Sequence, residues 1–361
     1  MPVNTLYATW FQFLSQLLPH ERITRLRNLA WLISGIAASR SVGLSHVAGV
    51  LPSTVQLLSV VRRLDRFLEN SAFKVRAWYE PYVRPLLQAH PERTLQLIID
   101  SSQIGLHQQW LVVALAYRHR ALPLAWDWVG YAKGHSPAAQ QLALLEYVRT
   151  LVPRGRRVMI VGDAEFGSLP VLKTLEAWGW HYVFRQRGQI WVRPEVYGRW
   201  QRFRTLVAHP GAPRWFHRWQ VTAQQRHLTH LVVHWAHAER QPWLLVTNLP
   251  SCAQALQAYR RRMWIEEMFG DLKGHGVHFE ATRLRDPEKL SRLALAVVLL
   301  YLGCIAYGVQ ARRRGESARV DRRTRRDLSL VQIGWRLIQR CLVNATSFHW
   351  RFNPFQYESV R

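Results

Sequence analysis

The sequence predicts an α/β fold with a helical region on either side of it. Three observations lead to this prediction. Residues 1–90 carry apolar side chains at helical spacing, short apolar runs typical of strands begin at Thr94, and helical periodicity returns at about Ala253. The chain has 361 residues, of which 48% are hydrophobic and 20% charged, so it is long and apolar enough to fold around substantial cores.

Residues 1–90 are expected to form an all-α, DNA-binding domain. Pro, Gly and Asn residues interrupt its apolar periodicity and divide it into five helices. A short helix beginning near Ser45 and the helix after it resemble a helix-turn-helix, and the second carries Arg62, Arg63 and Arg66, which would contact DNA. A solvated basic helix face is the alternative. The five helices are expected at 5–18, 21–38, 43–50, 54–69 and 72–89.

The central region, residues 91–310, changes to strand-like sequence. Short apolar runs end in Asp100 and in Asp163, and two further strands and a helix lie between them. Three antiparallel strands, a helix and another strand are the opening order of a ribonuclease H-like (retroviral integrase-like) domain, which is therefore the predicted catalytic fold. The expected elements are strands at 95–100, 110–117 and 121–129, a helix at 137–151 with Ser136 as its N-cap, and a strand at 157–163.

The later part of the chain is expected to alternate between strand and helix. Residues 189–249 are rich in β-branched and aromatic side chains with turn signals, and indicate a β-rich insertion. The most apolar run, 293–308, is shorter than a membrane span and is expected to be a buried core helix, so no membrane partner is indicated. Residues 311–361 form an arginine-rich helical C-terminal region, with eight arginines in the DNA-seeking or mobile block 312–326. The remaining expected elements are helices at 167–178, 253–273, 287–310 and 328–342 and a strand at 181–186.

The composition points to a polyanionic partner. The net charge is +26, and only five of the basic residues are lysines, so the charge is mostly arginine. Nucleic acid is the favoured partner, ahead of an anionic membrane surface. The three cysteines lie far apart without paired Cys or His spacing, so neither a disulfide framework nor a zinc site is indicated, and no signal peptide is recognised. These features are typical of a cytoplasmic protein.

Three carboxylates are candidates for a catalytic metal site. Asp100 and Asp163 end apolar strands, and Glu266 lies in a helix that can pack across the strand ends. Each acid alone is more often a solvated strand end or a cap, but three in this order are less easily explained so in a strongly basic chain. Phosphodiester chemistry requires two divalent ions, and Mg²⁺ prefers oxygen ligands. Asp100 would bridge the ions, Asp163 and Glu266 would each complete one, and Glu165 ranks below them as a substitute ligand.

The helix that carries Glu266 also carries three other polar groups. Tyr259, Arg262, Glu266 and Lys273 fall within roughly 60° of arc on one continuous helix, beside an apolar stripe that would anchor it to a core. This arrangement suits a metal-binding carboxylate flanked by phosphate-binding groups. The alternative is an ordinary solvated face on which Arg262 and Glu266 pair at i,i+4 spacing.

The spacing Tyr-x2-Arg-x3-Glu-x6-Lys resembles the YREK signature of bacterial insertion-sequence DDE transposases that form hairpins in a cut-and-paste route. The segment 243–250, beginning at Trp243, is similar to the strand before the signature helix, and 160–167 resembles the family's second-aspartate motif. The resemblance covers about residues 45–310. It implies the catalytic metal ligands Asp100, Asp163 and Glu266.

The resemblance further implies how DNA is held. Tyr259, Arg262 and Lys273 would bind phosphates of the transposon end, and Trp243 would stack on a base flipped from the duplex. A tryptophan at a strand start is otherwise usually part of a core. The implied enzyme is a transposase using two Mg²⁺ ions, with Mn²⁺ as a substitute. It would act on terminal inverted repeats and target DNA as a homodimer associated with the bacterial nucleoid.

Two rival functions are consistent with the same residues. One is a metal-dependent DNA nuclease of the same fold that cuts without joining strands. The other is a DNA-binding derivative whose catalytic centre no longer works. The end sequence, the preferred target site and the dimer interface are not encoded in any recognisable motif.

Overall fold

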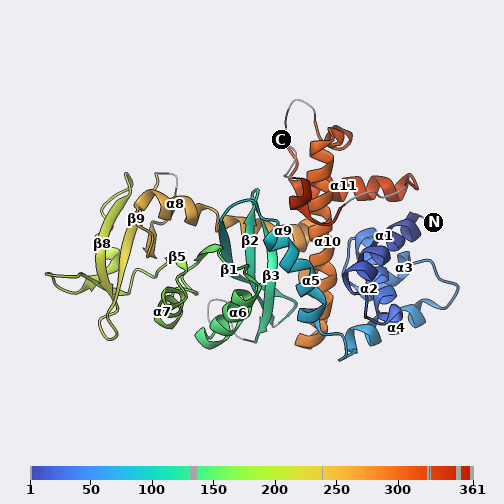
Figure 1. Cartoon of the computed structure of the whole chain (residues 1–361), viewed down its shortest axis with the longest axis horizontal. Helices are drawn as coiled ribbons and strands as arrows, with labels where there is room; N and C mark the ends of the chain where they lie inside the picture. The colour runs from blue at the N-terminus through green and yellow to red at the C-terminus, as the bar shows by residue number, and fades with distance from the viewer. Residues whose placement is uncertain are drawn as a thin grey trace.

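The computed structural model describes residues 2–106, 108–130, 136–237, 239–322, 325, 327–346 and 351–357. A ten-stranded sheet runs along the molecule in the order β3-β2-β1-β4-β5-β10-β9-β8-β6-β7. The N-terminal helices lie at one end of the molecule and the β-rich strands at the other, with the long helix α10 (Pro287–Arg313) beside the first strands (Figure 1). The mixed α/β class predicted from the sequence is confirmed.

The N-terminal region is helical, as predicted. Its elements are α1 (Pro2–Leu17), α2 (Ile23–Ser39), α3 (Leu44–Val50), α4 (Leu57–Glu69) and α5 (Val75–Gln88). Helices α3 and α4 pack against each other, and Arg62, Arg63 and Arg66 lie on the exposed side of α4. Helices α2, α4 and α5 contact α10, and their apolar side chains join the same hydrophobic core as the sheet. A domain boundary near residue 90 therefore stays a prediction.

The predicted opening order of the central region is observed. Strands β1 (Thr94–Ile104), β2 (Gln108–Tyr117) and β3 (Arg120–Val129) form an antiparallel meander, and α6 (Ala138–Leu151) then leads to β4 (Arg157–Gly162). Strand β4 pairs in parallel with β1. After α7 (Leu169–Ala177), β5 (His181–Arg185) pairs in parallel with β4. The carboxyl ends of β1, β4 and β5 therefore point toward one edge of the sheet.

Two local predictions in this region were wrong. Asp100 does not end its strand, because β1 continues to Ile104, where it pairs with Gln108 of β2. The hairpin extends β1 beyond the end of its parallel neighbour β4, which a single-strand pattern does not reveal. Ser136 does not cap α6, whose N-cap position is Pro137 without a side-chain hydrogen bond. The hydroxyl of Ser136 instead donates to the carboxylate of Glu165.

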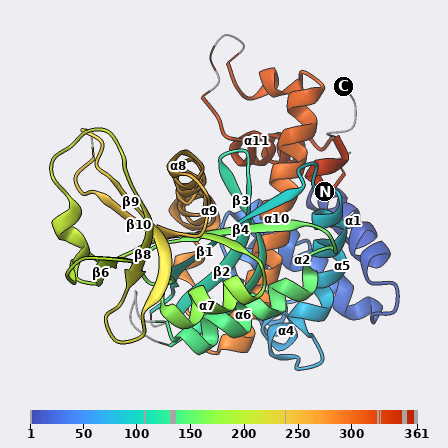
Figure 2. The same ribbon diagram turned by 60° about the vertical axis from the view of Figure 1, so that its left-hand side comes forward.

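The predicted β-rich insertion extends the same sheet. Its elements are β6 (Trp191–Pro194), β7 (Gln201–Arg202), the 3-10 turn Phe203–Leu206, β8 (Arg214–Val221), β9 (His227–His234) and β10 (Trp243–Thr247). Strand β10 pairs antiparallel with both β5 and β9, so the last strand of the insertion also belongs to the central part of the sheet. Figure 2 shows these strands continuing from the central sheet as a curved ribbon on the side away from α10.

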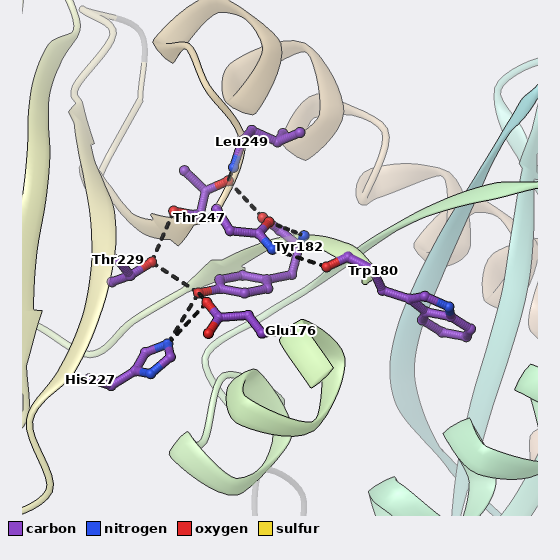
Figure 3. A network of polar contacts seen from close by, with 8 residues as sticks. Glu176, Trp180, Tyr182, His227, Thr229, Thr247 and Leu249 are labelled. Atoms are coloured by element: carbon purple, nitrogen blue, oxygen red, sulfur yellow. Dashed lines mark hydrogen bonds and ion pairs between the residues drawn. The ribbon is translucent and has the colours of Figure 1, made fainter. Parts of the chain in front are cut away.

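A buried polar network joins this extension to the central sheet (Figure 3). The hydroxyl of Tyr182 on β5 lies 2.8 Å from Oε1 of Glu176 on α7, 3.0 Å from Oγ1 of Thr229 and 3.3 Å from Nε2 of His227 on β9. Thr229 Oγ1 in turn donates to the carbonyl of Thr247 on β10. Four elements thus share one set of hydrogen bonds around a buried phenol, which fixes where β9 lies against β5 and α7.

The helix predicted for 253–273 is broken in two. Helix α8 (Cys252–Arg260) and helix α9 (Met263–Leu272) are separated by a turn, and Lys273 begins a π-helical turn, Lys273–Val277. At the break, the amides of Arg261 and Arg262 donate to carbonyls three residues back, as in a tightened 3-10 turn. The prediction of one continuous ribbon was wrong because Arg261 and Arg262 turn toward β1, where they bind Gln96 and Asp100.

Helix α10 is the central helix of the fold. It contacts α2, α4, α5 and β3, and α11 (Leu330–Val343) packs along it. The expectation of a buried helix over 293–308 is confirmed, and the buried part is longer than the apolar run. Within the described ranges, α10 is long and apolar enough to cross a membrane by composition, but its apolar window lies entirely inside the fold. The other short elements are the 3-10 turns Phe279–Ala281, Glu316–Arg319 and Pro354–Tyr357. Residues 323, 324 and 326 of the predicted arginine block lie outside the described residues.

Candidate active site

The three predicted carboxylates meet at the edge of the sheet where β1, β4 and β5 point. Ile99 and Gly162 form the last parallel pair of β1 and β4, so Asp100 and Asp163 are the next residues on the two neighbouring strands. Helix α9 contacts β1 and brings Glu266 across this edge. Asp100, Asp163 and Glu266 all line one cleft of about 570 Å³.

Asp100 is the innermost of the three acids. Only 7% of the residue is exposed, and its Oδ1 accepts the backbone amide of Ser101 at 2.8 Å. Burial raises the pKa of its carboxyl to about 7, against the opposing charge of Arg262 and with the added repulsion of Asp163 and Glu266. A carboxylate in this position is unfavourable until more positive charge reaches it.

Arg262 lies between two of the acids. Its Nη1 is 3.1 Å from Oδ2 of Asp100, and its Nη2 donates to Oε1 of Glu266. Burial lowers the pKa of Arg262, but the charges of Asp100 and Glu266 raise it more, so this pKa lies above its ordinary value. The i,i+4 pair of Arg262 and Glu266, which the sequence left as an alternative, is therefore formed. It lies in the cleft, where Arg262 also contacts Asp100 of β1.

Glu165 is held away from the cleft. Its Oε1 accepts the backbone amide of Ser136 at 2.9 Å as well as the Ser136 hydroxyl, and its Oε2 lies 3.5 Å from the hydroxyl of Ser101. The backbone amide of Glu165 donates to Oδ1 of Asp163 at 2.8 Å. Glu165 thus orients the loop after β4, and its place below the three acids as a ligand stays a prediction.

The other signature residues lie at different depths. Tyr259 is buried and lines the cleft, and burial raises the pKa of its phenol, so the hydroxyl remains a hydrogen-bond donor. The amino group of Lys273 donates to the hydroxyl of Ser102 at 2.7 Å, two residues along β1 from Asp100, but Lys273 does not line the cleft. The half-buried Trp243 packs edge-on against Tyr259 with ring centroids 5.0 Å apart. Its neighbours Pro242 and Leu244 line the cleft, but Trp243 itself is not among the lining residues.

The sequence interpretation missed two arginines of the cleft. Arg185 and Arg187 line it together with Gln186, and Nη2 of Arg185 donates to the carbonyl of Pro242 at 3.1 Å. They follow β5, the third strand that ends at this edge, just as the two aspartates mark β1 and β4. Two arginines at the end of an apolar strand were a usable signal, because parallel strands present their carboxyl ends together.

The N-terminal arginines predicted to contact DNA lie elsewhere. Arg63 and Arg66 line a second cavity of about 350 Å³ with Arg22 and Arg25 of the α1–α2 turn and α2, while Arg62 is exposed beside them. This surface belongs to the N-terminal helices and is separate from the carboxylate cleft. It is basic, as contact with a DNA backbone requires.

The donor set of the cleft suits a divalent cation, although its acids are not drawn together. Among the described residues, no group of three His, Cys, Asp or Glu side chains has metal-binding proximity. The guanidinium of Arg262 contacts both Asp100 and Glu266. Mg²⁺ prefers carboxylate oxygens as ligands, and a bound cation would favour the charged form of the buried acid.

Residues 93–302 match the family model described as a transposase DDE domain. Among solved structures, the fold resembles the piggyBac transposase in a synaptic complex with hairpin DNA. The two are 13% identical, with a TM-score of 0.51 over 95% of this chain and 77% of that one. A match to the Marinitoga piezophila Argonaute, bound to guide RNA and target DNA, has a TM-score of 0.23 at 10% identity, over 69% of this chain and 37% of that one, too low to indicate a shared fold. A search of curated proteins found no match.

Proposed function

We propose that this chain, which belongs to the family of transposase DDE domains, is a DNA transposase of the YREK-signature, hairpin-forming type. It would nick one strand at each transposon end, and the freed 3′-hydroxyl would attack the opposite strand to form a hairpin. Reopening of the hairpin would precede insertion into target DNA. The observation that carries the proposal is the convergence of Asp100, Asp163 and Glu266 from β1, β4 and α9 on one cleft.

In this proposal the three carboxylates hold two Mg²⁺ ions, with Mn²⁺ as a substitute. The bound ions would stabilise the attacking and leaving oxygens of each phosphoryl transfer. Arg262 contacts one oxygen of each carboxylate, Oδ2 of Asp100 and Oε1 of Glu266, so the other oxygen of each can bind an ion while Arg262 stays in place. Arg262 also lines the cleft, where its guanidinium can donate to a DNA phosphate.

The other cleft residues would position DNA. Arg185 and Arg187 sit on the β5 side of the cleft and supply positive charge opposite α9. The protonated hydroxyl of Tyr259 can donate to a phosphate oxygen, and Lys273 would bind the strand farther along β1. Phosphoryl transfers of this kind depend on positioning and charge stabilisation more than on further protein chemistry. Two protomers are expected in the active assembly, because two transposon ends must be held together.

A matched pair of neighbouring glutamates tests the proposal. Glu267 is adjacent to Glu266 but faces Arg120 on β3, with Oε2 3.3 Å from Nη1, and does not line the cleft. We expect Glu266→Gln to lower cleavage of a terminal-repeat duplex by at least about 100-fold without changing its affinity for that duplex. Glu267→Gln should cleave like the unmodified protein. The assay is denaturing gel analysis of end-labelled DNA with Mg²⁺ and with EDTA.

The same gels separate the rival functions. Hairpin-length products and products joined to target DNA are expected in addition to nicked strands. Nicked strands without either of these products would indicate a nuclease instead of a transposase. Equal cleavage by Glu266→Gln and the unmodified protein would remove Glu266 from the mechanism, and end binding without any cleavage would indicate an inactive derivative.

A further inference from the structure

A basic groove lies in the C-terminal region, away from the carboxylate cleft. It has a volume of about 800 Å³ and is formed by the end of α2, the 3-10 turn Glu316–Arg319 with the segment after it, and one face of α11. Helix α11 packs against α1, α2 and α10, so this wall of the groove is part of the packed helical region (Figure 1). The family model, which ends at residue 302, does not reach the two C-terminal walls.

The charge of the groove is not neutralised by its own acids. Five arginines line it, against two aspartates: Arg40, Arg319, Arg322, Arg336 and Arg340 against Asp321 and Asp327. The carboxylate of Asp321 accepts backbone amides of its own loop, and Asp327 pairs with arginines of that loop. Over the part of the chain that the structure covers, Arg319, Arg336 and Arg340 are exposed and form no ion pair with a carboxylate.

The spacing of these arginines favours an extended anion. Arg336 and Arg340 are four residues apart and so share one face of α11, where two like charges repel each other. A bound polyanion relieves this repulsion. The groove is open, so it suits an extended backbone that passes through it better than it suits a small, enclosed ligand. The net charge of +26 on the whole chain favours nucleic acid as that polyanion.

The groove is also connected to the proposed DNA-binding side of the cleft. Nη2 of Arg40 donates to the carbonyl of His275 at 3.1 Å, and the amide of Val42 donates to the carbonyl of Val277 at 3.2 Å. Both carbonyls belong to the π-helical turn that Lys273 begins. The same Arg40 guanidinium lies 5.8 Å from the ring of Trp335 on α11. The groove wall and the residue proposed to hold the transposon end are therefore parts of one packed unit.

We propose that this groove binds the phosphate backbone of the transposon-end duplex, at a position away from the cleavage site. This inference rests on the proposed function. It gives the arginine-rich C-terminal region a defined role in end binding. It assigns phosphate contacts to Arg319 and Arg340, whose side chains form no ion pair or hydrogen bond among the described residues, while Arg336 also donates to the carbonyl of Val320 at 3.4 Å.

The test is the double variant Arg319→Gln/Arg340→Gln, with Arg154→Gln/Lys173→Gln as a control that removes the same charge from exposed positions outside the groove. The probes are a duplex with the terminal repeat that flanks the gene and a shuffled duplex of equal length. We expect the groove variant to bind both duplexes at least about tenfold more weakly. The slope of log affinity against log salt should fall by roughly two, the loss expected for two phosphate contacts. Arg319→Lys/Arg340→Lys should retain most of the affinity, and an unchanged melting temperature would show that the variants fold.

The outcomes distinguish failure of the groove proposal from failure of the proposed catalytic function. Loss of affinity equal to that of the control variant, or no loss, would overturn the groove proposal while leaving the cleavage assay of Glu266→Gln unaffected. Normal end binding combined with reduced capture of target DNA by a preassembled end complex would overturn the assignment to the end duplex. Weakened binding by a protein that shows no cleavage would support the groove and count against the catalytic function.

Discussion

Asp100 is a buried carboxyl whose charge is favoured by Arg262 but disfavoured more strongly by desolvation and by the neighbouring acids. Its pKa in the folded protein is about 7, above the ordinary value of 3.8, and burial is the main cause. Between these two values the folded state binds a proton that the unfolded state has released. Stability in the absence of metal is therefore fully present below about pH 4 and falls as the pH rises through 7.

The variant Asp100→Asn should isolate this effect. The amide stays neutral and can still accept from Arg262, so the variant should be more stable than the unmodified protein at pH 8 in EDTA. We expect the difference in unfolding free energy to grow by a few kcal/mol from pH 4 to 7, since one pKa unit corresponds to about 1.4 kcal/mol. Urea unfolding over this pH range measures it. Saturating Mg²⁺ should reduce the difference, because the ion binds the charged carboxylate. A difference independent of pH would contradict the assignment.

Trp243 lies where a role in hairpin formation and a role in packing predict different results. Its ring touches Tyr259, which lines the cleft, yet Trp243 itself is not among the lining residues. If it moves to stack on a flipped base, Trp243→Ala should reduce hairpin formation by about 10-fold or more while nicking is largely retained, since stacking contributes about 1–3 kcal/mol per base. Trp243→Phe should restore most of the hairpin yield. Single-turnover gels measure both steps, and an equal loss of both would indicate that Trp243 only supports Tyr259.

At the scale of elements, the Tyr182 network holds the β-rich extension to the central sheet. Tyr182→Phe removes the hydroxyl that Glu176, Thr229 and His227 share. Thr229 keeps its bond to the carbonyl of Thr247, and His227 keeps its contact with Glu176. We expect a loss of about 0.5–1.5 kcal/mol in unfolding free energy, the usual net contribution of a hydrogen bond, because each former partner of the hydroxyl keeps another partner. Tyr197→Phe is the control, because that residue is 88% exposed and should show no change. Equal stability of the two variants would mean that the network adds nothing to the junction.

Element types were predictable from the sequence where a local pattern decides them. The apolar runs before Asp100 and Asp163 identified β1 and β4, while the order of the three acids and the resemblance to the signature led us to expect Glu266 across their ends. The break between α8 and α9 was not predictable, because apolar periodicity continues through Arg262 and only the long-range contact with Asp100 turns the chain. The pairing of the β-rich strands also depends on partners distant in sequence. Arg185 and Arg187 were predictable in principle, since they mark the third strand end at the same edge.

At the scale of the whole molecule, α10 ties the N-terminal helices to the sheet and to α11. Helices α10 and α11 contact each other at glycine residues. A Cβ added at Gly308 would lie 2.0 Å from the carbonyl oxygen of Leu330, and one added at Gly334 would lie 1.9 Å from that of Cys304. Neither neighbour is a flexible side-chain end, so the two helices can only respond by separating.

Gly334→Ala and Gly308→Ala should therefore destabilise the entire fold, with each lowering the unfolding free energy by about 1–3 kcal/mol or more. Gly49→Ala is the matched control, since nothing lies within 4 Å of its added Cβ and alanine is the better helix former in α3. Its unfolding free energy should rise by about 0.4–1 kcal/mol. Urea unfolding followed by circular dichroism measures all three. Because α10 contacts the N-terminal helices and the sheet alike, the glycine variants should unfold in one transition at lower urea. A separate early transition confined to part of the helical signal would instead show that the N-terminal helices fold independently of α10.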